Sequence, residues 1–177
     1  MFSYPPLKTG QTTVYTVGDN GINQSGVARD YTGPTQDPAY TSDYTTTDNV
    51  TGLVWKTCSE GSSGATCTGG AATIMDWSTV QNSCNSLNTQ NSGAGYAGRK
   101  DWRLPTGEEL ETLVDYSKYS PAIGTSAFPA VTGVKYWGST SFKGYETDAV
   151  YVNFNGGTMS HESKGYSLNY VRCVSDP

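Results

Sequence analysis

The chain has 177 residues, a length that suits one domain with a single sizeable core. Its formal net charge is −5 and its 11 Lys and Arg residues form no cluster, which excludes the basic footprint that nucleic-acid binding requires. No stretch approaches the roughly 18 consecutive apolar residues of a membrane span, so the sequence predicts no membrane insertion.

The N-terminal segment, residues 1–47, carries no helical period and few aliphatic residues. We expect it to be irregular and to wrap the domain, with one strand over residues 12–17. Within it, Asp19, Asn20 and Asn23 offer the kind of oxygen ligands that a calcium loop uses, although the terminal bidentate Glu of that motif is absent. Calcium at these three residues is therefore the one cofactor for which the sequence offers a candidate site.

Regular elements are predicted from residue 48 onward. We expect a strand over residues 50–56, with Leu53 and Trp55 on one face. A helix is predicted over residues 76–88, where Asp76 is a suitable N-cap. The buried stripe of this helix repeats at helical spacing and consists of Trp77, Val80, Cys84 and Leu87.

A second helix is predicted over residues 106–115, because Thr106 and Glu109 form a capping-box pattern after Pro105. A loop follows over residues 115–134. We expect the remaining chain to form short antiparallel strands over residues 135–141, 148–154, 158–162 and 169–174, with a tight turn at Asn155-Gly156-Gly157. Two helices followed by such strands indicate an α+β domain.

The four cysteines are Cys58, Cys67, Cys84 and Cys173, and four cysteines allow three pairings. Cys58 and Cys67 bracket a flexible loop that a local bridge would fix, which leaves Cys84 with Cys173. The alternatives are a zinc site or free reactive thiols, but the spacing lacks the close Cys pairs of zinc sites and the chain has only one His. Two disulfides predict an oxidising location, which is the periplasm, the cell surface or the extracellular medium.

Several segments follow one another in an order and spacing that resemble the Lcl C-terminal domain-like family of bacterial surface and secreted proteins. They span residues 48–174 and include Asp101-Trp102-Arg103-Leu104-Pro105-Thr106 and Tyr170-Val171-Arg172-Cys173-Val174. Parts of both segments also resemble the formylglycine-generating-enzyme branch of C-type-lectin-like folds.

This resemblance implies a C-type-lectin-like fold over residues 48–177, with two helices packed on a small twisted antiparallel sheet and with long loops. It also implies a disulfide between a helix and the last strand, which agrees with Cys84–Cys173. Because some family members bind host glycosaminoglycans and some form trimers, a glycan partner and a homotrimer are further implications.

No group of residues forms a recognisable catalytic set, so we predict that the protein is not an enzyme. His161 is the single His, and its strand neighbours Ser160 and Glu162 would point to the opposite face. Catalysis of the formylglycine type needs reactive cysteines, whereas the four cysteines here are assigned to bridges. We expect structural roles for Trp55, Trp77, Trp102, Arg103, Thr106 and Glu109.

The C-terminal region mixes Tyr with Asn, Ser and His, a combination that supplies rigid aromatic area and adaptable hydrogen bonds at binding surfaces. The alternative is that these tyrosines fill a thin core between short strands. The candidate ligand-binding residues are Tyr136, Trp137, Tyr145, Tyr151, Asn153, Asn155, His161, Tyr166 and Asn169.

Together these observations predict a non-catalytic, adhesin-like module that recognises a glycan or a host or partner protein through its C-terminal loop and strand face. One alternative is a variable binding protein of the kind diversified by retroelements, in which Asn, Tyr, Ser and Asp positions near the C-terminus would vary. Another alternative is a structural component of an envelope assembly.

Overall fold

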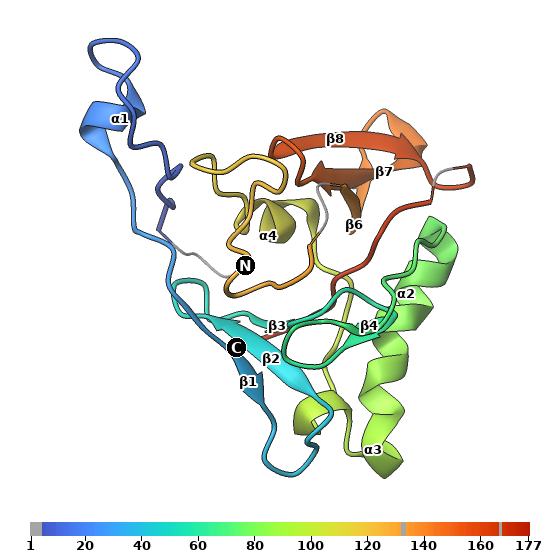
Figure 1. Ribbon diagram of the computed structural model, residues 1–177. Coiled ribbons are helices and arrows are strands. Elements are labelled where there is room, and N and C mark those ends of the chain that lie inside the picture. Colours follow the sequence, from blue (N-terminus) through green and yellow to red (C-terminus); the bar gives the residue numbers. More distant parts are fainter. Residues whose placement is uncertain (1–4, 132–133, 167) are drawn as a thin grey trace.

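The computed structural model describes residues 5–131, 134–166 and 168–177, so residues 1–4 of the expected N-terminal segment and residues 132–133 of the expected loop lie outside it. Three antiparallel sheets and a few short helices make up the described chain, which is therefore an α+β fold (Figure 1). None of the described helices is long and apolar enough to cross a membrane.

The first sheet has four strands in the order β1-β2-β3-β9. Its strands are β1 Tyr31–Gln36, β2 Tyr44–Asp48, β3 Val54–Lys56 and β9 Val174–Ser175. The last strand, β9, pairs with β3 through Val54 opposite Ser175 and Trp55 opposite Val174. This pairing brings the end of the chain back beside its first strands, where the C-terminus lies in Figure 1.

The second large sheet is a meander of three strands, β6 Lys135–Phe142, β7 Tyr145–Asn153 and β8 Thr158–Ser163. The predicted turn at Asn155-Gly156-Gly157 is confirmed, because it joins β7 to β8 and the Gly157 amide donates to the Asn153 carbonyl at 2.9 Å. A two-stranded ribbon, β4 Ser62–Ser63 and β5 Gly69–Gly70, completes the sheets.

Both predicted helix starts are confirmed. Helix α2 spans Trp77–Ser86, and the Asp76 side chain accepts a hydrogen bond from the Thr79 amide at 3.0 Å. Helix α4 spans Gly107–Glu111 with a complete capping box between Thr106 and Glu109. The remaining short helices are α1 Asn20–Asn23, α3 Gln90–Gly93 and the 3-10 helices η1 Leu87–Thr89 and η2 Tyr96–Gly98.

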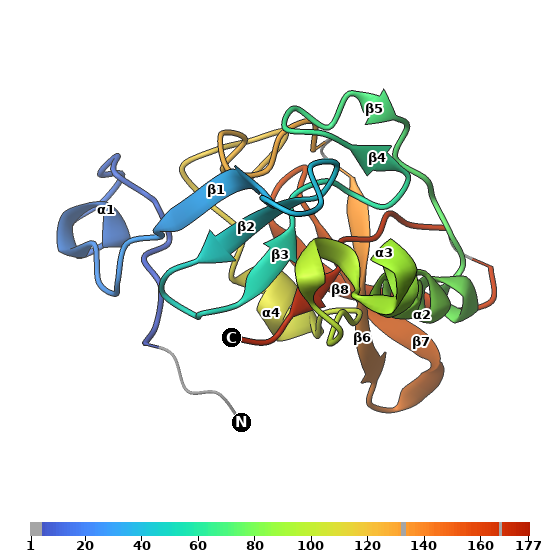
Figure 2. The same ribbon diagram turned by 90° about the horizontal axis from the view of Figure 1, so that it is seen from below.

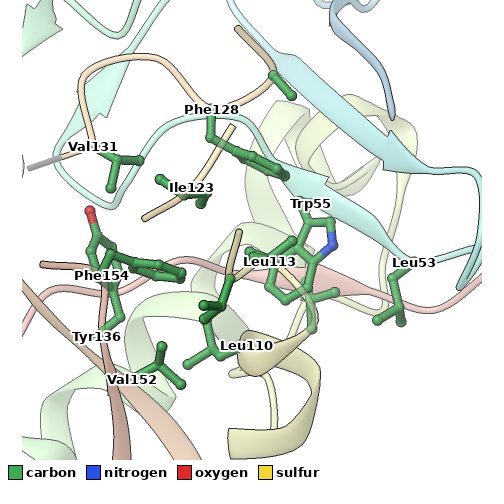
Figure 3. Packing of buried hydrophobic residues seen from close by; sticks show 13 residues of the cluster. Leu53, Trp55, Leu110, Leu113, Ile123, Phe128, Val131, Tyr136, Val152 and Phe154 are labelled. Carbon is green, nitrogen blue, oxygen red and sulfur yellow. The ribbon is translucent and has the colours of Figure 1, made fainter. Parts of the chain in front are cut away.

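Two hydrophobic cores hold these elements together. The larger core packs Trp55 from β3, Leu110 from α4 and Phe154 after β7 against one another (Figure 3). The second core sits under α2, where Val80 and Trp102 are at most 1% exposed. Burial of each such side chain stabilises the fold by about 1.5–3 kcal/mol, which explains how a chain of low apolar content sustains a core.

Both predicted disulfides are present. Cys58–Cys67 closes a loop that contains β4 and ends just before β5, and Cys84–Cys173 joins α2 to the segment before β9. No described cysteine is free. The pairing is typical of proteins that mature in an oxidising compartment.

The expected N-terminal segment needs correction. Residues 12–17 form no strand, and the Asp19 side chain instead caps α1 on an arm that projects from the rest of the fold (Figure 1). The segment is also not irregular throughout, because it contains β1 and most of β2. The expected division between residues 47 and 48 therefore falls inside β2.

Three further expectations differ from the structure. Residues 50–52 form a turn rather than the start of a strand, because the Asp48 side chain accepts from the amides of Val50 and Thr51. Asn169 and Tyr170 make only isolated bridges, residues 171–173 belong to no strand, and β9 begins at Val174. The single small sheet is in fact two separate sheets and a ribbon, since β9 pairs with β3 and not with the meander.

Candidate functional site

Three of the candidate ligand-binding residues are buried, which corrects their assignment to a binding face. Tyr136, Trp137 and Asn169 are 1%, 0% and 4% exposed. The Tyr136 hydroxyl is hydrogen-bonded to the Ser59 hydroxyl at 2.8 Å, and the Trp137 indole donates to the Met75 carbonyl at 3.0 Å. These side chains stabilise the fold and cannot contact a ligand.

Two other candidates have clear local roles. The Asn153 side chain accepts from the Asn155 amide at 2.9 Å and so shapes the β7–β8 turn. The Tyr151 ring lies 4.5 Å from the Lys135 ammonium, a cation–π contact, and that ammonium pairs with Glu162 at 2.6 Å. Tyr151 remains half-buried and Asn155 partly accessible at the edge of the same region.

His161, Tyr145 and Tyr166 remain accessible. His161 Nδ1 lies 2.8 Å from Asp148 Oδ2, and its ring stacks on Phe142 at 3.7 Å. A carboxylate that orients a His is part of a catalytic triad, but no hydroxyl of the described residues is hydrogen-bonded to His161 Nε2. Tyr145 and Tyr166 are 63% and 95% exposed.

A groove opens at the start of α2. Its volume is about 430 Å³, and its lining residues are Asp76, Trp77, Ser78, Lys164, Gly165 and Leu168. The Trp77 indole donates to the Gly138 carbonyl of β6 at 3.0 Å, which holds the ring between helix and sheet. The Lys164 ammonium lies 4.4 Å from that ring and donates to the Ser141 hydroxyl at 2.6 Å.

A second groove of about 450 Å³ follows along the same helix. It is lined by Gln81, Asn85, Arg103, Leu104, Thr106 and Ser139. Positions 77, 81 and 85 are each four residues apart, so they share one side of α2, over a length of about 12 Å. Both grooves border α2, the first at its start and the second farther along, where Ser139 of β6 lines the opposite wall; α2 and β6 are neighbours in Figure 2. We name both together the α2 groove.

The charges at the two ends of the α2 groove differ. Hydrogen bonds from the side chain of Ser78 and from Thr79 lower the pKa of Asp76 to about 2, so this carboxylate stays ionised. In the described part of the chain, Lys164 has no carboxylate within ion-pair distance. At the other end, Glu109 and Asp176 neutralise Arg103. The middle of the groove is neutral and carries side-chain amides.

The structure also places the candidate calcium ligands. Asp19 accepts from the Tyr15 amide at 2.8 Å, and Asn20 accepts from the Ser25 amide at 3.3 Å. Asn23 donates to the Gly18 carbonyl at 3.2 Å. These groups fold the tip of the arm, and no group of three or more His, Cys, Asp or Glu among the described residues could hold a metal ion.

Trp55 and Trp102 are buried, and Trp77 is partly buried while it also lines the α2 groove. Gln81 and Asn85 were not among the candidate residues predicted from the sequence. Gln81 and Asn85 lie four and eight residues after Trp77, along the edge of the buried stripe, and this spacing is the signal that could have found them.

A family model described as the Lcl C-terminal domain matches residues 44–175. The matched region starts at the first residue of β2 and ends at the last residue of β9, and it contains both disulfides and the lining of the α2 groove. No match was found among curated proteins.

Proposed function

The chain belongs to the Lcl C-terminal domain family, and from that premise we propose that it is a non-catalytic, secreted or surface-exposed module that binds a glycan in the α2 groove. The observation that carries this proposal is the combination of Trp77 with the side-chain amides of Gln81 and Asn85 along one side of α2. The accessible edge of Trp77 and the Leu168 side chain offer apolar area to a sugar ring. Amides both donate and accept, as sugar hydroxyl groups require.

The chemistry of the groove favours a neutral or weakly acidic glycan. Lys164 supplies one positive charge, whereas Asp76 beside it is an ionised carboxylate. With a net charge of −5, the chain does not suit a densely sulfated polysaccharide, which binds through clustered basic residues. The proposed ligand therefore gains affinity from stacking and hydrogen bonds, and its binding is expected to survive physiological salt.

The test is binding of the purified protein to a broad glycan array, at low and physiological salt, with calcium and with a chelator. The key variant is Asn85→Ala, which removes one amide from the groove. Its matched control is Asn82→Ala, because Asn82 is also an exposed Asn on α2 but does not line the groove. Both variants change helix propensity equally, so only the groove distinguishes them.

Support for the proposal is binding at physiological salt that Asn85→Ala weakens by about tenfold and Asn82→Ala leaves unchanged. Loss of binding in the presence of the chelator would mean that a calcium ion takes part in glycan binding. Equal binding by both variants would mean that the glycan binds outside the α2 groove. Absence of binding to every glycan on the array contradicts the proposal. The protein would then bind a protein partner or have a structural role in an envelope assembly.

A further inference from the structure

The outer edge of β8 presents unpaired backbone groups. The Lys164 amide donates to the Thr147 carbonyl at 2.9 Å, which fixes the phase of the β7–β8 ladder. Hydrogen-bonded and non-bonded pairs alternate along an antiparallel ladder. The N–H and C=O groups of Met159, His161 and Ser163 therefore point away from β7. Within the described chain, no backbone or side-chain group pairs with them.

The other long edges of the sheets are covered or interrupted. The Trp137 amide of β6 donates to the Tyr170 carbonyl, and the Ser139 amide donates to the Pro105 carbonyl at 2.7 Å. On β1, Pro34 lacks an amide hydrogen, and the register shifts between Thr32 and Thr35. Such devices protect sheet edges from other strands. By contrast, β8 has six residues without Pro or a shift in register.

We propose that β8 pairs with β8 of a second copy of this chain, antiparallel and about a two-fold axis at His161. This register uses all three outward residues, because Met159 of one copy meets Ser163 of the other and His161 meets its own counterpart. On the other face, Ser160 meets Glu162, so no two acidic side chains lie opposite each other. The two meanders then form one six-stranded sheet.

The contact is small, because it joins two strands of six residues with one exposed apolar side chain, Met159, on each. Stable dimers generally bury about 1,200 Å² or more, so this pairing is expected to be reversible and to depend on concentration. It involves neither Trp77 nor the amides of the α2 groove. The dimer therefore leaves the Trp77 ring and these amides unpaired, while Lys164 of the groove lies at the end of the paired segment, opposite Thr158 of the other copy.

Sedimentation equilibrium over a wide range of protein concentration tests this pairing. The variant Met159→Pro removes an outward N–H without removing a bond to β7, since the Met159 amide faces away from β7. The control Met159→Ala removes the same side chain and keeps the N–H. Near-ultraviolet circular dichroism checks that both variants are folded.

We expect wild type and Met159→Ala to associate with concentration, and Met159→Pro to associate at least about tenfold more weakly. Hydrogen exchange of the wild type should show protection over residues 158–164 that rises with concentration. A monomer at every concentration overturns the proposal. So does association of Met159→Pro equal to that of Met159→Ala, or concentration-dependent protection confined to other segments such as the α1 arm.

Discussion

Arg103 and Glu109 form a two-pronged ion pair, with Nη1 2.8 Å from Oε2 and Nη2 2.7 Å from Oε1. The same Oε2 accepts from the Thr106 amide at 2.8 Å, and the same guanidinium contacts Asp176. One carboxylate thus completes the capping box of α4 and ties this helix, through Arg103, to the end of the chain. Planar pairs of this kind are among the stronger hydrogen-bonded contacts in proteins.

Replacing this carboxylate should change the pH dependence of stability. Burial alone would raise the pKa of Glu109, but the hydrogen bonds from Arg103 and Thr106 outweigh it and hold that pKa below its ordinary value of 4.5. Because this pKa is lower in the folded state, the carboxylate contributes its full stabilisation above pH about 4.5. That contribution is lost as the pH falls below 4.5 and through the lower folded-state pKa. We expect Glu109→Gln to lower the free energy of unfolding by about 1–3 kcal/mol at pH 7.

Urea unfolding at pH 7 and at pH 3 measures this effect, and the difference between wild type and Glu109→Gln should shrink at the lower pH. The matched control is Glu108→Gln, which alters an exposed acid in the same helical turn. A constant difference at both pH values, or an equal loss in the control, contradicts the assigned role of the ion pair. Asp115, whose pKa is also lowered, should leave some acid sensitivity in every variant.

Removal of each disulfide should lower the free energy of unfolding, and the two losses should be unequal. Cys84 and Cys173 are 89 residues apart, whereas Cys58 and Cys67 are 9 apart. In the chain-entropy model the long loop contributes about 4–5 kcal/mol and the short loop about 2.5–3 kcal/mol. Denaturant titration of the two double Cys→Ala variants compares them. A larger loss for the short loop would show that packing around the bridges, and not loop length, decides their contribution.

Features that depend on a few neighbouring residues could be predicted from the sequence. The N-cap Asp76 and the capping box of Thr106 and Glu109 lie within one turn of the helices that they start. The turn at Gly156 and Gly157 is equally local. The bounds of the strands were less accurate, because they depend on which segment pairs with which. β9 illustrates this, since its partner is β3.

Burial could not be predicted in the same way. Tyr136 and Trp137 are adjacent in β6, so they point to opposite faces of the sheet. A sheet with one solvated face would expose one of them. Here Tyr136 belongs to the larger core and Trp137 to the core under α2, because both faces are covered at this point. Of the expected binding face, Tyr145, His161 and Tyr166 remain accessible, and none of them lines the α2 groove.

Tyr136 offers a direct test of this correction. Tyr136→Phe removes the hydroxyl that is hydrogen-bonded to Ser59 and leaves the ring against Phe154, 5.3 Å between centroids. We expect a loss of about 1 kcal/mol in the free energy of unfolding and no change in glycan binding. Calorimetry and the glycan array measure the two quantities. If folded Tyr136→Phe binds glycan more weakly than wild type, Tyr136 takes part in ligand binding and the correction is wrong.

Arg172 is a buried cation that the sequence analysis did not identify. It is 0% exposed, donates to the carbonyls of Lys56 and Thr57, and lies 5.0 Å from the Phe128 ring. No carboxylate among the described residues pairs with it, and burial lowers its pKa. Its role is to satisfy carbonyl groups between β3 and the Cys58–Cys67 loop.

Truncation of Arg172 should therefore be more harmful than replacement by an apolar side chain of similar length. Arg172→Ala leaves a cavity and unpaired carbonyl groups, and we expect it to cost about 3–5 kcal/mol. Arg172→Met fills the space and removes the cost of burying a charge, so it should lose clearly less. Denaturant titration of both variants decides this. Equal losses would mean that the guanidinium hydrogen bonds outweigh packing.

The β7–β8 turn supplies a matched pair of adjacent glycines. Gly157 has a φ of +74°, and a Cβ there would collide with the Val114 side chain, whereas a Cβ on Gly156 would approach only the Tyr119 ring, at 3.9 Å. Gly157→Ala should cost about 1–3 kcal/mol, because Ala disfavours this φ and Val114 is fully buried. Gly156→Ala should be close to neutral. Thermal unfolding of the two variants measures the difference. Equal stability of the two would show that the turn adopts another conformation in solution, which would also shift the register from which the outward groups of β8 were assigned.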